Sequence, residues 1–223
     1  GWLTSVTEPD GASLTYTTNA EGWITSVTDS LGRTTSYTYD AVGNIQTQTD
    51  SDGVTTSYTY DGSGNVTSTT IDGKTSYAEY YPNGKIAKET DQSGISTVYT
   101  YDHNWRLSNV TRDTGEAISY TYDSCGNLSK EIDALGNQTI YTYDSRGNVL
   151  SKTDPMGNIT NYIYDAADNV ICQIDALNNR TNYRYDSQGR LTELIQADGS
   201  TYTFTCDTAD NITSVTDPVG NTI

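Results

Sequence analysis

Residues 141–149 read YTYDSRGNV, and a second block, DPMGN, follows at residues 154–158. Each contains an aspartate followed three residues later by a glycine, the pattern of a type I turn closed by a residue in the left-handed conformation. The short segments between the blocks are rich in Thr, Tyr and Val, which favour strands. The stretch therefore predicts a β-hairpin with turns at the Asp-x-x-Gly blocks.

This pattern repeats along the whole chain. Its second tyrosine recurs at Tyr39, Tyr60, Tyr80, Tyr101, Tyr122, Tyr143, Tyr164 and Tyr185, always 21 residues apart except for the 20-residue step from Tyr60 to Tyr80. The shorter step reflects DSDG at 50–53 becoming IDG at 71–73. The frame extends back to Thr18 and forward to Cys206. We expect residues 1–223 to form a single array of about ten repeats, cut mid-repeat at both ends.

The prolines provide an independent test of the turns. The chain has four, and each lies one residue after the first position of a block: Pro9, Pro82, Pro155 and Pro218. The fixed φ of proline suits that position of a type I turn, and no ladder hydrogen bond is lost there.

Strand alternation assigns the tyrosines to one face of a sheet. In residues 160–164, Tyr162 and Tyr164 share a face, and Asn161 and Ile163 share the other. An apolar residue six positions after each second tyrosine is expected to pack beside them: Ile24, Ile45, Val66, Ile86, Leu107, Leu128, Val149, Val170, Leu191 and Ile212. The prediction is an all-β, helix-free, continuous antiparallel sheet of roughly twenty strands, which normal strand twist makes curl or spiral.

Two sets of residues are predicted to hold this structure together. The first is a ladder of paired tyrosines: Tyr37, Tyr39, Tyr58, Tyr60, Tyr99, Tyr101, Tyr120, Tyr122, Tyr141, Tyr143, Tyr162, Tyr164, Tyr183 and Tyr185. The second is the set of turn residues: Asp40, Gly43, Asp61, Gly64, Asp123, Gly126, Asp144, Gly147, Asp154, Gly157, Asp186 and Gly189.

The motif Tyr-x-Tyr-Asp-x-x-Gly-Asn-Val/Leu, followed by Asp-x-x-Gly-x-x-Thr-x-Tyr, resembles the YD repeat, or Rhs repeat. That repeat occurs in bacterial Rhs and wall-associated proteins, Tc insecticidal toxin complexes and teneurins. The resemblance covers essentially the whole chain. It implies a spiralling β-shell segment of a secreted or cell-surface protein, which encloses a toxin or other cargo in the parent protein. The shell-closing motif and a toxin-like C-terminal tail are missing from this sequence.

Some turn positions depart from the motif, and these departures affect only the expected geometry of the turns that contain them. Trp105 and Asp168 occupy glycine positions. Residues that replace a turn aspartate are Asn19, Tyr81, Arg112 and Gln196.

Charge and composition argue against several functions. The net charge is −17, which disfavours binding to nucleic acid or to an anionic membrane surface. No stretch is long and apolar enough to insert into a membrane. The three cysteines, Cys125, Cys172 and Cys206, have no metal-binding spacing and are expected to be free thiols.

Nothing in the sequence favours catalysis or a cofactor. The single His103 would have to serve any triad alone, and the carboxylates lie on equivalent turns, which does not drive their pKa values apart. A calcium loop at Asp61–Asn65 lacks the glutamate expected at position twelve, so a structural turn is favoured. Sequons at Asn65, Asn109, Asn127, Asn137, Asn158, Asn179 and Asn211 follow from the turn motif and are weak indications of glycosylation.

The sequence thus favours a non-catalytic structural segment whose partners are flanking repeats or copies of itself. Two alternatives remain open. One is a self-assembling extracellular fibre built by head-to-tail strand addition. The other is an adhesion module for glycans or a cell-surface receptor, using the exposed rings of Trp2, Trp23 and Trp105.

Overall fold

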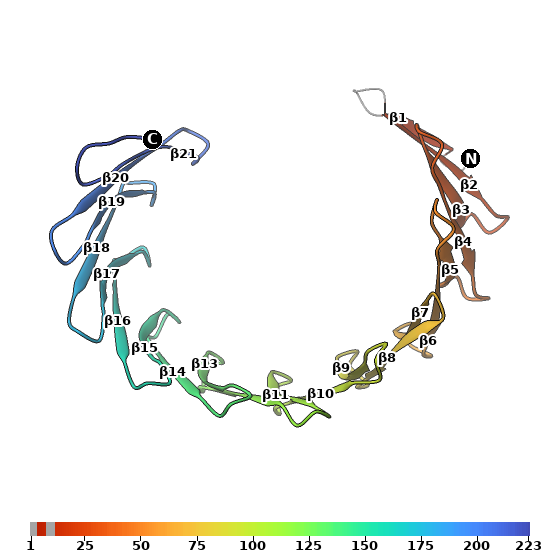
Figure 1. Ribbon diagram of the computed structural model, residues 1–223, viewed down its shortest axis with the longest axis horizontal. Coiled ribbons are helices and arrows are strands. Elements are labelled where there is room, and N and C mark those ends of the chain that lie inside the picture. Colours follow the sequence, from red (N-terminus) through yellow and green to blue (C-terminus); the bar gives the residue numbers. More distant parts are fainter. Residues whose placement is uncertain (1–3, 8–11) are drawn as a thin grey trace. The chain divides into compact units, whose positions relative to one another are not determined.

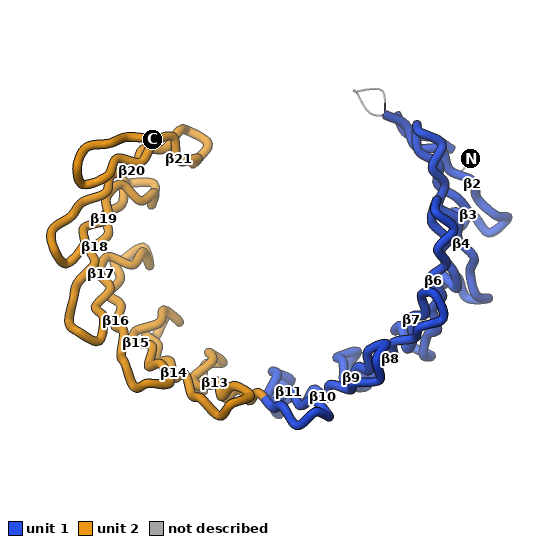
Figure 2. The backbone as a smooth tube through the Cα atoms, viewed as in Figure 1, with its two compact units in different colours: residues 1–117 blue, residues 118–223 orange. Residues whose placement is uncertain are grey.

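The structure, a computed structural model, describes residues 4–7 and 12–223 (Figure 1). The chain divides into two compact units, Gly1–Ala117 and Ile118–Ile223 (Figure 2). The described residues form 21 strands and no helix, which confirms the all-β prediction. The predicted turn at Pro9 and the residue Trp2 lie outside the described residues.

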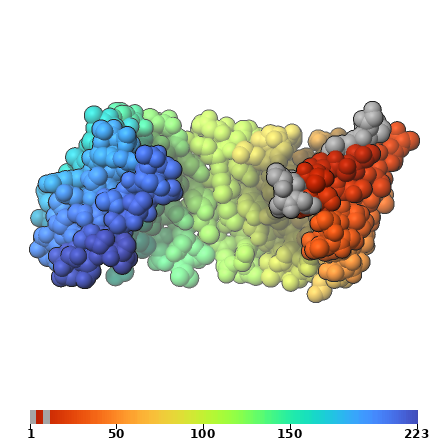
Figure 3. Space-filling model, turned by 90° about the horizontal axis from the view of Figure 1, so that it is seen from above, coloured from red at the N-terminus to blue at the C-terminus, as the bar shows by residue number. Residues whose placement is uncertain are grey.

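Unit 1 is an antiparallel meander in which each strand pairs with the next along the chain. In the space-filling view its residues follow one another in chain order, from red to yellow-green (Figure 3). The strands are β1 (Ser5–Thr7), β2 (Ser13–Thr18), β3 (Ile24–Asp29), β4 (Thr34–Tyr39), β5 (Ile45–Thr49), β6 (Thr55–Tyr60), β7 (Val66–Ile71), β8 (Lys74–Tyr80), β9 (Ile86–Thr90), β10 (Ser96–Tyr101) and β11 (Leu107–Arg112).

Unit 2 repeats the same arrangement, with every strand antiparallel to its neighbour in sequence. Its first strand begins at Ala117, the last residue of unit 1. The strands are β12 (Ala117–Tyr122), β13 (Leu128–Ile132), β14 (Gln138–Tyr143), β15 (Val149–Thr153), β16 (Ile159–Tyr164), β17 (Val170–Ile174), β18 (Arg180–Tyr185), β19 (Leu191–Ile195), β20 (Thr201–Cys206) and β21 (Ile212–Thr216).

Two kinds of turn alternate along each unit. The first turn follows the Tyr-x-Tyr strand, as at residues 40–44, and the second turn follows the next strand, as at 50–54. In both, the fourth residue donates its N–H to the first residue's carbonyl, and the first donates to the fifth: Gly43 to Asp40 at 3.3 Å, and Asp40 to Asn44 at 2.9 Å. Gly43 has φ 98°. This is a type I turn closed by a left-handed residue.

A β-bulge accompanies the first turn but not the second. Between β4 and β5, Thr38 faces Thr47 whereas Tyr39 faces Ile45, so Gln46 is the extra residue. Hairpins at the second turn keep a regular register, as from Thr49 opposite Thr55. The bulge places the second tyrosine directly across from the apolar residue that follows the turn. The second tyrosine and this apolar residue come from the two strands of the hairpin and therefore lie on the same face of the sheet.

The 20-residue repeat contains a shorter hairpin. Ile71 pairs with Lys74, so only Asp72 and Gly73 form the turn between β7 and β8. Both have positive φ, 50° and 74°, as a two-residue hairpin turn with the twist of the flanking strands requires. The deletion therefore shortens one second turn and leaves the strand pairing intact.

The interior of each unit is thin. Among the described residues only Cys172, on β17, is buried, with 5% of its surface exposed. Along β16 exposed and half-buried residues alternate, and Tyr162 and Tyr164 are on the half-buried side. No buried side-chain nitrogen or oxygen in the described part lacks a hydrogen-bond partner. A Tyr- and Thr-rich sheet is suited to such an interior, because its hydroxyls can stay hydrogen-bonded.

Candidate functional site

The second tyrosine of a repeat is bonded to the repeat before it. The Tyr60 hydroxyl donates to the carbonyl of Ile45, fifteen residues earlier, at 2.7 Å. Ile45 is the apolar residue that faces the preceding second tyrosine, Tyr39. The same bond joins Tyr39 to Ile24, Tyr80 to Val66, Tyr101 to Ile86, Tyr143 to Leu128, Tyr164 to Val149 and Tyr185 to Val170. Partial burial raises the pKa of Tyr60 and Tyr164.

The first tyrosine reaches back toward the adjacent strand. The Tyr99 hydroxyl donates to Glu89 Oε2 at 2.7 Å, and the Tyr183 hydroxyl to Gln173 Oε1 at 3.3 Å. In both cases the acceptor lies ten residues earlier in the chain. The hydrogen bond to the Glu89 carboxylate raises the pKa of Tyr99 to about 12. In these two repeats the first tyrosine is therefore bonded to a side chain of the adjacent strand, whereas the second tyrosine is bonded to a backbone carbonyl.

The turn aspartate uses its carboxylate within its own turn. Asp61 Oδ1 accepts the backbone N–H groups of Ser63 and Asn65, and Oδ2 accepts the Asn65 side-chain amide at 2.9 Å. The bond from the Asn65 side chain is the main reason that the pKa of Asp61 lies below its usual value. In several turns an arginine takes the place of this asparagine, as where Arg190 Nε donates to Asp186 Oδ2 at 2.7 Å.

The fifth turn residue is a structural position that the sequence reasoning missed. Its recurrence as Asn after the turn glycine was the available signal. Asn44, Asn148 and Asn169 make the same side-chain bond to their turn aspartate as Asn65 does.

The residues considered for metal binding or acid–base chemistry lie in turns or on separate strands. The carboxylate of Asp61, in the loop considered for calcium, is already engaged by three donors of its own turn. Within residues 4–7 and 12–223, no group of three or more His, Cys, Asp or Glu side chains could hold a metal ion. His103 lies exposed in the first turn that Asp102 begins. The free thiols Cys125, Cys172 and Cys206 are on separate elements.

The sequon asparagines are engaged as well. In the turns, the side-chain amide of Asn65, Asn127, Asn137, Asn158, Asn179 and Asn211 donates to the aspartate four residues earlier. Asn109, on β11, donates to Thr100 Oγ1 at 3.1 Å.

First turns of successive repeats also contact each other. In unit 2, Asn148 Nδ2 donates to Asp168 Oδ1 at 2.6 Å, and Arg146 forms an ion pair with the same carboxylate at 2.9 Å. Asp168 occupies a glycine position with φ 67°. In unit 1 the ring of Trp23 lies where a Cβ on Gly43 would meet it, at 2.9 Å. These contacts join successive repeats at their turns, as the tyrosine hydrogen bonds join them at their strands.

Two departures from the motif lie against each other in unit 1. Trp105 stands at a turn-glycine position and has φ 60°. Tyr81 stands at a turn-aspartate position one repeat earlier. Their ring centroids are 5.4 Å apart, and Tyr81 lies 5.7 Å from the ring of Tyr101. Both turns keep the usual backbone bonds, from Gly84 to Tyr81 and from Trp105 to Asp102. The aromatic contact thus accompanies the loss of two turn-forming residues.

The two tryptophans in the described part of the chain pack against tyrosine rings. Trp23 packs on Tyr39 with a centroid distance of 5.2 Å. Trp105, 44% exposed, packs on Tyr81 and Tyr101. The adhesion alternative also uses Trp2, which lies outside the described residues.

Successive hairpins that are bonded to their neighbours at strand and turn define a tandem-repeat structural protein. The chain belongs to the RHS repeat family. Residues 19–53, 39–75, 122–157, 143–176, 164–201 and 185–222 match the RHS Repeat. A comparison with curated proteins found no match.

The fold is shared with solved Tc toxin structures. The Photorhabdus luminescens Tc holotoxin pore carrying a TccC3-D651A mutation is 18% identical with a TM-score of 0.61, over 96% of this chain and 13% of that one. The structure of TcdB2-TccC3-TEV is 14% identical with a TM-score of 0.55, over 96% of this chain and 15% of that one. This chain therefore spans only a small part of the chains it resembles. Within the described residues no helix is long and apolar enough to cross a membrane.

Proposed function

We propose that this chain is a non-catalytic wall segment of a protein shell, within a longer secreted or cell-surface protein that encloses a toxin or other cargo. The observation that carries the proposal is the bonding between repeats. The second-tyrosine hydroxyl of one repeat ends on the backbone of the repeat before it, as from Tyr164 to Val149 at 2.9 Å. A sheet built this way extends by adding identical units, which is what a wall requires.

The turn chemistry supports the absence of catalysis. A carboxyl group that acts as a general acid or base near neutral pH is most effective when its pKa is raised toward the working pH and when substrate can reach it. The pKa of Asp61 is shifted the other way, to below its usual value, and its oxygens are engaged by the turn. The lone imidazole, His103, lies on an exposed turn. Residues 1–223 serve as one array whose partners are the flanking repeats of the parent chain.

Protease protection of the longer parent protein tests the enclosure. A segment held inside the shell should survive a protease concentration that digests the same segment expressed alone. Mild acid or urea that opens the repeats should abolish the protection. Equal digestion with and without the repeats would contradict the proposal.

Electron microscopy of the purified chain separates the shell segment from the fibre alternative. Short discrete sheets at every salt concentration support a wall segment. Filaments that lengthen with added salt, as the charge of −17 is screened, would favour head-to-tail assembly instead.

A further inference from the structure

One repeat of unit 1 lacks the first tyrosine of the pair. Ala78 occupies that position, two residues before Tyr80. The corresponding residues of the other described repeats are all aromatic: Tyr16, Tyr37, Tyr58, Tyr99, Tyr120, Tyr141, Tyr162, Tyr183 and Phe204. The neighbouring Tyr77 does not substitute for it. Tyr77 pairs with Ser68 on the opposite face of the strand and is 55% exposed, whereas Ala78 pairs with Glu89 on the tyrosine face.

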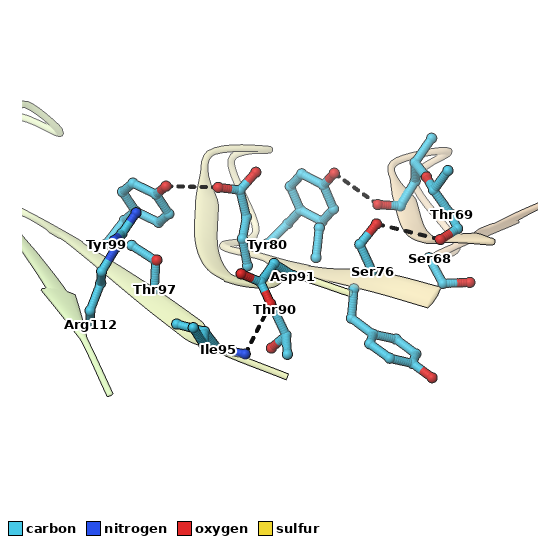
Figure 4. A pocket seen from close by; sticks show the side chains of 14 residues that line it. Ser68, Thr69, Ser76, Tyr80, Thr90, Asp91, Ile95, Thr97, Tyr99 and Arg112 are labelled. Carbon is cyan, nitrogen blue, oxygen red and sulfur yellow. Dashed lines mark hydrogen bonds between the residues drawn. The ribbon is translucent and has the colours of Figure 1, made fainter. Parts of the chain in front are cut away.

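A cavity of about 500 Å³ lies at this position (Figure 4). Thr69, Ser76 and Tyr80 line it on the β7–β8 side, and Glu89, Tyr99 and Arg112 line it on the β9–β11 side. A cavity of about 150 Å³ is large enough for benzene, so this one has room for a single substituted ring. Its volume is within the range of small-molecule sites, about 300 to 1,000 Å³.

The repeat symmetry indicates which ring fits. The hydroxyls of Tyr99 and Tyr183 reach Glu89 and Gln173, which stand opposite Thr97 and Thr181 in the strand pairing. The equivalent of Glu89 in the shortened repeat is Thr69, because Thr69 stands opposite Ser76. Thr69 lines the cavity. A phenol ring in the vacant position would therefore have a hydroxyl-bearing residue where its neighbours have their acceptor.

From this geometry we infer that the cavity at Ala78 binds a para-hydroxyphenyl group, which takes the place of the missing tyrosine. The ring lies in the space that the alanine leaves on the tyrosine face, and its hydroxyl is directed to Thr69. The ligand binds as the neutral phenol, because a phenol with an ordinary pKa of about 10 keeps its proton near neutral pH. The same group is found on a small phenol and on a tyrosine side chain of another polypeptide. Binding at this position is independent of what a shell would enclose.

The test is a titration of the whole chain with p-cresol, in which NMR spectra of the labelled protein report binding. Saturable shifts confined to residues around Ala78 are expected. Ala78→Tyr places the chain's own ring in the cavity and should weaken p-cresol binding by more than about tenfold. Ala78→Ser, which keeps the space, is the matched control and should bind like the parent. Circular dichroism melts establish that both variants are folded.

A second variant tests the orientation. Thr69→Val removes the hydroxyl and nearly keeps the shape, so it should weaken p-cresol while leaving toluene unchanged. A short peptide with one tyrosine between glycines distinguishes the two sources. If the peptide binds, the source is a polypeptide side chain, and if only p-cresol binds, it is a small phenol. Absence of binding, equal binding to Ala78→Tyr, or binding of methyl glucoside in place of p-cresol would overturn the inference.

Discussion

The hydroxyl of Tyr164, on β16, donates a hydrogen bond of 2.9 Å to the backbone carbonyl of Val149, at the start of β15. Val149 faces Tyr143, so this bond connects the second tyrosines of two successive repeats through one residue. The later tyrosine supplies the donor, and the residue opposite the earlier tyrosine supplies the backbone acceptor.

Removing this hydroxyl should weaken the array. Tyr164→Phe leaves the ring in place and deprives the Val149 carbonyl of its donor, which should cost about 0.5–1.5 kcal/mol of unfolding free energy. Tyr162→Phe is the matched control, since the Tyr162 hydroxyl has no hydrogen bond within the described part of the chain, and it should change stability less. Urea unfolding measures both. Equal losses would show that the bond contributes nothing.

The turn glycine Gly147 should tolerate asparagine better than valine. Its φ is 92°, and a Cβ there would lie 3.6 Å from Asn127 Oδ1, an ordinary contact, so space is not the obstacle. Backbone strain with a β-branched residue should cost Gly147→Val about 1–2 kcal/mol. Asn178 already holds φ 65° in another turn, so Gly147→Asn should lose less. Thermal melts of the two variants that coincide would contradict this.

Acid should remove the stability that the turn carboxylates provide. The pKa of Asp61 in the folded chain lies below its ordinary 3.8, chiefly through the Asn65 side chain. Its contribution is therefore complete above pH 3.8 and is lost as the pH falls through the folded value. The melting temperature of the parent should exceed that of Asp61→Asn near neutral pH, and the gap should close in acid. A gap independent of pH would sink this account.

The Tyr99 hydroxyl should lose its proton only at an unusually high pH. Its hydrogen bond to Glu89 raises its pKa to about 12, so the folded state holds this proton more tightly than the unfolded state does. The stabilising contribution is present below the ordinary value of 10 and is lost as the pH rises through 12. Glu89→Gln should bring the Tyr99 titration, followed by ring NMR, back toward 10. A titration unchanged by the substitution would refute the role of Glu89.

The two aromatic departures from the motif should be energetically coupled. Tyr81→Asp and Trp105→Gly each restore the motif residue and each remove the ring contact at 5.4 Å. The cycle with the double variant should give a coupling of about 0.5–1.5 kcal/mol, because aromatic pairs contribute that much beyond their burial. Strictly additive effects on the free energy of unfolding would mean that the two replacements are independent.

Local chemistry is what the sequence by itself determined. Backbone preferences within a few residues produce the 21-residue period, the Asp-x-x-Gly turns and the alternation of Tyr162 with Ile163. These features can therefore be predicted from the sequence. The acceptor of each tyrosine, the contact between Trp105 and Tyr81 and the cavity at Ala78 were decided only by the tertiary structure. Those features arise where residues from different repeats lie side by side. The bulge at each first turn shifts the register there by one residue, and strand spacing then decides which partners come within hydrogen-bonding distance.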